Sequence, residues 1–143
     1  MAGQINIKRA AVTTVKPRVD ELEDGGYLAE IKINSPEEVE QALLRAEQLF
    51  EQGAVGEQTG PATFVLYGPE VAIFLKENYQ QYKDIVDLAA RLSAFKVVDI
   101  RVCELRLGLM GQNKEAMHPF VGTVSYGPGE VERLIQDEHY HYF

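Results

Sequence analysis

The sequence predicts one α/β domain, a three-layer α/β/α arrangement around a mostly parallel sheet of about five strands. The chain has 143 residues, the length of one domain, and its 45% hydrophobic and 25% charged residues are ordinary for a globular protein. Short apolar or β-branched segments alternate with amphipathic helical segments along the chain. This alternation implies right-handed crossovers and a parallel sheet that helices cover on both faces.

The first part of the chain divides into an arm, a strand and a helix. Residues 1–26 alternate weakly and end in two glycines, so we predict an N-terminal arm or edge strand there. Imperfect alternation in residues 27–33 predicts a strand. Ser35 is a natural N-cap, with Pro36 at the first helical position and Glu38 at the capping-box spacing. The apolar face of the helix that follows recurs at helical spacing and consists of Val39, Ala42, Leu43, Ala46, Leu49 and Phe50 before Gly53.

The remaining elements follow from local pattern and turn residues. An apolar run without alternation at 62–67 is typical of a strand covered on both faces. The β-branched segment 97–103 also predicts a strand, and 104–111 fits a short helix or a loop. The other expected elements are short helical faces around 71–79, 85–92 and 127–135 and strands at 120–125 and 139–143.

Charge and cysteine content exclude several classes of protein. Fourteen basic and 22 acidic residues give a net charge of −8, so we predict no nucleic-acid partner, because phosphate contacts need clustered cations. No apolar run approaches the ~20 residues of a membrane helix, and the N-terminus has no secretory h-region. The single cysteine, Cys103, precludes an internal disulfide. We therefore expect a cytoplasmic protein without a membrane partner.

Motif searches favour neither a cofactor nor a metal. The chain has no Walker A, GxGxxG or GxSxG sequence, and no zinc-ligand spacing. His139 and His141 are two residues apart, so on a strand they would share a face and could form half a metal site. A packed or interfacial aromatic tail is the more common structure for a segment such as HYHYF. We predict no cofactor and no metal, and keep a metal-assisted enzyme as the weakest hypothesis.

Two turns share the sequence Tyr-Gly-Pro, at residues 67–69 and 126–128. Each follows a predicted strand and opens a helical segment, so both are expected at the carboxyl edge of the sheet, where α/β proteins bind ligands. The simpler interpretation is convergent turn chemistry, since glycine tolerates positive φ and proline suits a helix start. Glu70 and Glu130 would repel a phosphate at these turns.

Cys103 is the candidate site residue. It ends the predicted strand 97–103, which places it at the carboxyl edge of the sheet and near the start of a short helix. A helix N-terminus lowers a thiol pKa, and Arg101 and Arg106 could add positive charge while the adjacent Glu104 opposes them. The alternative is a buried structural cysteine, because free cysteines are among the most buried residues.

Four segments resemble the DsrE/DsrF-like family, which includes the YchN-like and sulfur-relay proteins. They are INSPEEVEQALLRAEQLFEQG, ATFVLYGPEVAIFL, DLAARLSAFKVVDIRVCELRLGLMG and PFVGTVSYGPGEVERLIQDEHYHYF. The resemblance covers roughly residues 27–143 and leaves 1–26 outside it. It implies a parallel sheet of about five strands, trimers or hexamers, and a cysteine at the place of Cys103 that carries a persulfide. Glu104 and Arg106 depart from the small or apolar residues that the family often has there.

The resemblance implies a small sulfur-carrier or sulfurtransferase-like protein. Cys103 would take sulfane sulfur from a donor protein and pass it to an acceptor protein. The alternative is a non-catalytic, oligomeric binding module of the same fold, with Cys103 structural and a ligand at the two Tyr-Gly-Pro turns. We expect a homo-oligomer in either case, because the tail residues Tyr140, Tyr142 and Phe143 present apolar surface that a monomer would rarely expose.

Overall fold

The computed structural model describes residues 25–143, and its sheet confirms the predicted fold class. Five strands pair in the order β4-β3-β2-β1-β5, and every pair is parallel. All but two residues of the predicted N-terminal arm, 1–26, lie outside the described residues. The strands are β1 (Tyr27–Leu28), β2 (Ala62–Leu66), β3 (Val98–Cys103), β4 (Gly122–Val124) and β5 (His141–Tyr142).

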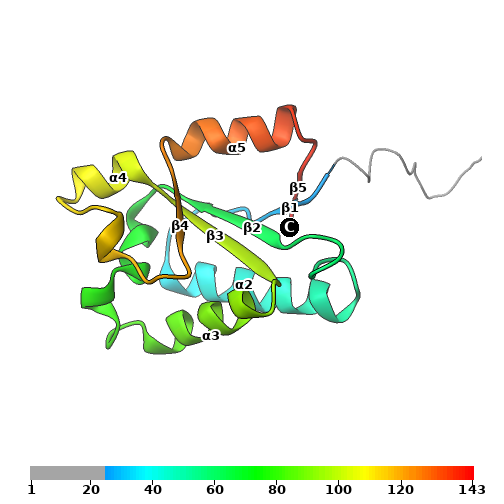
Figure 1. Ribbon diagram of the computed structural model, residues 1–143, viewed down its shortest axis with the longest axis horizontal. Helices are drawn as coiled ribbons and strands as arrows, with labels where there is room; N and C mark the ends of the chain where they lie inside the picture. The colour runs from blue at the N-terminus through cyan, green and yellow to red at the C-terminus, as the bar shows by residue number, and fades with distance from the viewer. Residues whose placement is uncertain (1–24) are drawn as a thin grey trace, which may run out of the picture.

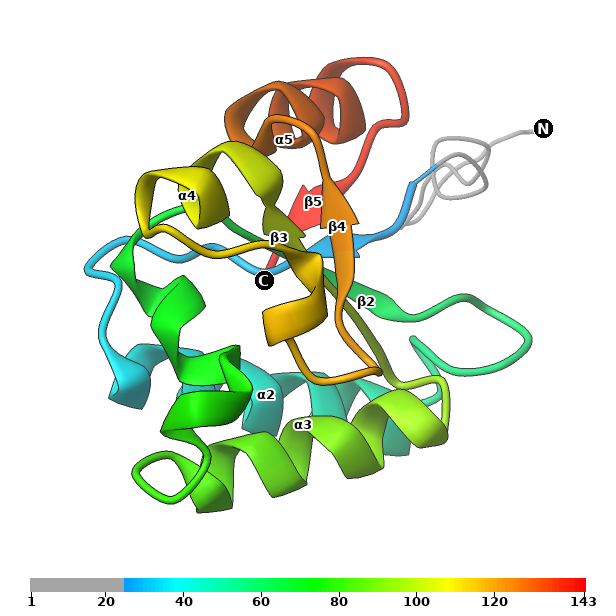
Figure 2. The ribbon, with the colours of Figure 1, turned by 60° about the vertical axis from the view of Figure 1, so that its left-hand side comes forward.

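The helices form the two outer layers. Helices α2 and α3 lie against one face of the sheet and α5 lies against the other (Figure 1). Seen from the side of β4, α4 and the start of α5 stand at the same end of the sheet (Figure 2). The α-helices are α2 (Pro36–Glu51), α3 (Lys83–Ala94), α4 (Glu104–Leu109) and α5 (Gly127–Gln136), and the 3-10 helices are η1 (Pro69–Phe74), η2 (Lys76–Asn78) and η3 (Lys114–Ala116).

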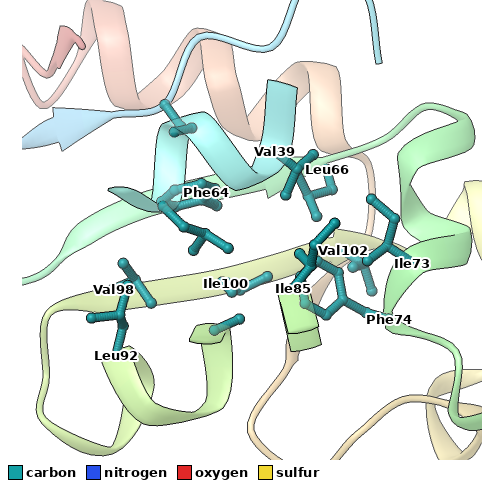
Figure 3. Close-up of a cluster of buried hydrophobic side chains, with 14 of the residues drawn as sticks. Val39, Phe64, Leu66, Ile73, Phe74, Ile85, Leu92, Val98, Ile100 and Val102 are labelled. Carbon is teal, nitrogen blue, oxygen red and sulfur yellow. The ribbon is translucent and has the colours of Figure 1, made fainter. Parts of the chain in front are cut away.

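The core is divided unequally between the two faces. On the α2 and α3 side, the alternate residues of β2 and β3 pack into one large cluster, which Figure 3 shows around Phe64, Leu66, Ile100 and Val102. On the α5 side only Leu28, Val65 and Leu134 form a fully buried cluster. All five residues of β2 are buried, which confirms the prediction of a strand covered on both faces. The α5 layer is therefore the thinly packed one.

The predicted start of α2 is confirmed, and the predicted strand 27–33 is present only in its first residues, as β1. The Ser35 Oγ accepts a hydrogen bond from the Glu38 N–H at 3.1 Å, with Pro36 opening the helix. The Glu38 carboxylate accepts bonds from the backbone N–H groups of Lys32, Ile33 and Asn34 at 2.6–2.9 Å. Ala29 and Glu30 still donate to the Thr63 and Phe143 carbonyls, whereas Glu38 takes the N–H groups of residues 32–34, so the sheet pairing does not continue to residue 33.

The apolar face of α2 is confirmed over most of its length. Val39, Ala42, Leu43 and Ala46 are buried. Phe50 is exposed instead, and its ring lies beside Gly56 in the loop that follows the helix. Gly53 follows the helix at φ 81°, as expected for a glycine that ends it.

The C-terminal tail packs on its own chain, contrary to our expectation. The Phe143 ring meets those of Tyr27 and Phe64 edge-on, with centroids 6.3 and 6.0 Å apart. Tyr140 packs against the α5-side cluster, and its ring lies so close to Gly26 that a Cβ there would be 2.8 Å away. Tyr142 alone of the three stays exposed. The tail therefore supplies little surface for an oligomer.

Within residues 25–143, the structure contains no helix of the length and apolarity that a membrane crossing requires.

Candidate functional site

Cys103 lies where the sequence places it. It is the last residue of β3 and the N-cap of α4, so it stands at the carboxyl edge of the parallel sheet. Its register partner on the neighbouring strand is Val124. Side chains alternate along a strand, so Cys103 shares the α5 face of the sheet with Arg101. This edge is where open α/β sheets place their sites.

The thiol is covered in the single chain. Cys103 is a free cysteine and only 2% of its surface is exposed. Its side chain makes no capping hydrogen bond to α4, although its backbone occupies the N-cap position. Position therefore agrees with a functional thiol, whereas burial agrees with the structural alternative. A reagent reaches the sulfur only when a covering segment moves.

The charged residues near Cys103 in the sequence have other partners. Arg101 donates to Asp99 and Glu130, with its Nη1 2.7 Å from the Glu130 carboxylate. Glu104 accepts a hydrogen bond from the Thr123 hydroxyl at 2.7 Å. The Arg106 Nε is buried without a hydrogen-bond partner among the described residues. Arg101, which we expected to add positive charge beside the thiol, is thus already paired with two carboxylates.

The two Tyr-Gly-Pro turns meet at the carboxyl edge, as their places in the sequence predict. A Cβ on Gly127 would lie 2.6 Å from the Cβ of Tyr67, so the second turn presses directly on the first. The expected reason for these glycines is wrong, because neither has a positive φ. Both are glycine because there is no room: a Cβ on Gly68 would lie 2.7 Å from the Glu70 carboxylate.

Glu70 is a buried residue that no sequence pattern singles out. It is 3% exposed, and its carboxylate accepts hydrogen bonds from the backbone N–H groups of Tyr67 and Gly68 and from the Asn34 side-chain amide. It thus joins the loop after β1 to the loop after β2. A carboxylate already fills the N–H groups that a bound anion would use, so this turn does not hold phosphate. A glutamate just after Gly-Pro resembles any helix-start acid, so the sequence carries no signal for its burial.

A cavity of about 130 Å³ opens beside these loops. Its walls come from the ends of β1 and β2, from Val131 of α5 and from Tyr142 of β5, and Tyr67 and Glu70 belong to its lining. Tyr126–Pro128 does not line it. A cavity is therefore present at the first Tyr-Gly-Pro turn, and the second turn lies next to it without lining it.

The histidines do not assemble a metal centre. Among residues 25–143, no three His, Cys, Asp or Glu side chains come close enough to hold a metal ion. His139 stands before β5 with a φ of 61°, so it does not share a strand face with His141. Nothing in the described part of the chain supports the metal-assisted enzyme.

The surroundings of His118 lower its pKa, which predicts a fold that is less stable in mild acid. Burial lowers the pKa of His118, the nearby Lys76 lowers it further, and Asp87 opposes both. Its ring stacks on that of Phe120 and meets that of Tyr79 edge-on, and its Nε2 is buried without a partner in residues 25–143. A folded pKa below the ordinary 6.5 favours the neutral ring. The stabilisation is therefore complete above pH 6.5 and is lost as pH falls through the folded pKa.

We predict that the wild-type protein loses more free energy of unfolding between pH 7.5 and 5.5 than His118→Phe does. Phenylalanine keeps the ring contacts but has no proton to bind. The carboxylates with lowered pKa values, Glu38, Asp87 and Glu130, titrate below this window. Urea denaturation at the two pH values measures the difference. Equal losses in the two proteins would contradict the assignment.

Comparison with known proteins bears on the fold alone. No protein-family model matches the sequence, and no curated protein matches it. The structure is similar to that of MTH1491, a protein of unknown function from Methanobacterium thermoautotrophicum, with a TM-score of 0.61 and 18% sequence identity. The match covers 82% of this chain and 93% of that one. A likeness at this identity supports the α/β fold that the chain adopts.

Proposed function

We propose that the protein is a small sulfur carrier that accepts sulfane sulfur as a persulfide on Cys103 and passes it to a partner thiol. The supporting observation is the place of Cys103, the sole cysteine, at the carboxyl end of β3 and the start of α4. The resemblance of residues 27–143 to the DsrE/DsrF-like family adds to it, because the sulfur-relay members of that family carry a persulfide at this place.

The transfer needs no second cysteine in the chain. The Cys103 thiolate attacks the outer sulfur of a donor persulfide, a new S–S bond forms, and the donor S–S bond breaks with its electron pair leaving on the donor thiolate. In the second step, a partner thiolate attacks the outer sulfur on Cys103, and the Cys103 thiolate leaves. Each step exchanges one S–S bond for another, so neither an oxidant nor a reductant is consumed.

The surface beside the thiol suits contact with a partner. Leu105 and Leu109 lie one turn apart on α4 and both are exposed, Leu109 by 72%. Tyr126 is also exposed, and the Leu105 N–H donates to the adjacent Ser125 carbonyl at 3.3 Å. Clustered apolar side chains at a surface are typical of protein interaction sites. Donor and acceptor proteins would meet the thiol here.

We propose that the carrier works in the cytoplasm as a trimer or hexamer, as the resemblance implies. Exposed Ile33, Leu105 and Leu109 supply the apolar surface that the C-terminal tail does not. Light scattering that gave the mass of one chain would contradict this part of the proposal.

We predict that reduced protein exposed to polysulfide gains one sulfur atom per chain, measured by intact mass. Dithiothreitol should remove the added mass. Cys103→Ser, which differs by one atom, should gain nothing. No gain in folded wild-type protein, or an equal gain in the Cys103→Ser variant, would contradict the carrier.

A second candidate is a binding module in which Cys103 is structural. The burial of the thiol and the cavity beside Tyr67 and Glu70 favour it. A small alkylating reagent separates the two hypotheses. Failure to label Cys103 under any condition short of global unfolding would favour the binding module.

A further inference from the structure

We propose that the first turn of α5 is a latch over Cys103, held shut by the Arg101–Glu130 ion pair, and that its release exposes the thiol while the rest of the domain stays folded. The proposed sulfur transfer gives the latch its purpose, but the test below does not depend on sulfur transfer. A latch of this kind explains how Cys103 can be buried in the closed state and still react at the sheet edge.

The start of α5 is tied to the carboxyl ends of two neighbouring strands, β2 and β3. Gly127 presses on Tyr67, at the end of the neighbouring β2, and Glu130 pairs with Arg101, which precedes Cys103 on the same face of the strand. The register partner of Cys103, Val124, packs with the cluster that contains Leu134 of α5. In both ribbon views the segment between β4 and α5 passes beside the start of α4 (Figures 1 and 2). These contacts bring the first turn of α5 to the residues that flank Cys103 on the same face of the sheet, Arg101 on its own strand and Tyr67 after the neighbouring strand.

Little apolar packing holds this turn down. Leu134 is the buried apolar side chain of α5, and it lies two turns further on. Within the first turn, Gly127 is buried and contributes no side chain. The buried cluster under the helix consists of Leu28, Val65 and Leu134, and the α5 side chains that pack against it, Val131 and Ile135, also follow the first turn. Regions with so few buried apolar contacts open locally at lower free energy than the core.

Ion pairs hold the first turn of α5 to the sheet instead. The Glu130 carboxylate lies 2.7 Å from Arg101 Nη1 and 2.9 Å from Arg133 Nη2, and the Asp99 carboxylate holds the other side of the Arg101 guanidinium at 2.8 Å. The side chains of Glu130 and Arg101 are only 15% and 25% exposed, so solvent screens this pair less than a surface pair. Short, charge-assisted bonds of this kind are among the stronger ones in proteins. Arg101–Glu130 joins the helix to β3.

The first test uses wild-type protein and a small neutral alkylating reagent. Cys103 labelling is followed by mass at increasing urea concentrations, below the unfolding transition. The latch predicts slow labelling whose rate depends on urea far less than global unfolding does, because a local opening exposes little surface. Labelling with the full urea dependence of global unfolding would overturn the proposal.

The second test removes the Arg101–Glu130 ion pair. We expect Glu130→Gln to raise the labelling rate in native conditions by about tenfold or more, since the labelling rate follows the population of the open form. Glu138→Gln is the matched control: it removes a carboxylate just beyond the C-terminal end of α5, where Glu138 pairs with Arg133 at the surface. The control rate should change by less than about twofold. Equal rates for the two variants would overturn the latch.

The outcomes separate the latch from the carrier. Faster alkylation of Glu130→Gln without sulfur uptake from polysulfide would support the latch and remove the carrier. Sulfur uptake by the wild-type protein, with alkylation unchanged in Glu130→Gln, would support the carrier and overturn the latch.

Discussion

Glu70→Ala is expected to lower the free energy of unfolding by about 3 kcal/mol, because it leaves two backbone N–H groups without their acceptor, at about 1–3 kcal/mol each. These groups belong to Tyr67 and Gly68, and the same change frees the Asn34 amide. The buried carboxylate fastens the loop after β1 to the loop after β2. Urea denaturation at neutral pH measures the loss.

Glu70→Gln is the matched control for this effect. The amide has nearly the same shape and keeps one oxygen as an acceptor, so we expect a loss between those of the wild type and Glu70→Ala. A loss below about 1 kcal/mol for Glu70→Ala would show that the buried hydrogen bonds of the carboxylate contribute little.

Gly127→Ala is expected to destabilise the protein by about 2–3 kcal/mol, the upper part of the range for overpacking. The new methyl group would lie 2.6 Å from the Tyr67 Cβ, which is fixed by the backbone of the first turn. The two turns would have to separate, and the start of α5 would shift from the sheet. Thermal and urea unfolding both report the loss.

Gly129→Ala provides the control in the same helical turn. A Cβ there meets only the Tyr126 ring, at 3.2 Å, and that ring is exposed and able to move. Alanine is also the better helix former, by about 1 kcal/mol. Gly129→Ala should therefore be neutral or slightly stabilising. Similar losses in both variants would argue against the close approach of the two turns.

The fold could be predicted from the sequence because its strongest signals are local. Apolar residues at 62–67 without alternation, the Ser35-Pro36 helix start and the helical spacing of Val39, Ala42 and Leu43 each specify an element without reference to the rest of the chain. Alternation of such strands and helices then specifies a parallel sheet. The position of Cys103 at a strand end follows in the same way.

The remaining features depend on contacts between distant residues. The buried Glu70 carboxylate binds the Asn34 amide, which lies 36 positions away. Phe143 folds back onto Phe64 rather than facing a neighbouring molecule. The ion pair of Arg101 with Glu130, 29 positions away, is of the same kind. Such contacts leave no periodic signal in the sequence.

The central claim is that Cys103 accepts one sulfur and gives it up to another nucleophile. The most direct measurement is cyanolysis of polysulfide-treated protein after removal of free polysulfide: cyanide takes the outer sulfur as thiocyanate and releases the Cys103 thiolate. The carrier predicts one thiocyanate per chain from the wild type and none from Cys103→Ser. No thiocyanate from the wild type, or the same amount from both proteins, would contradict it.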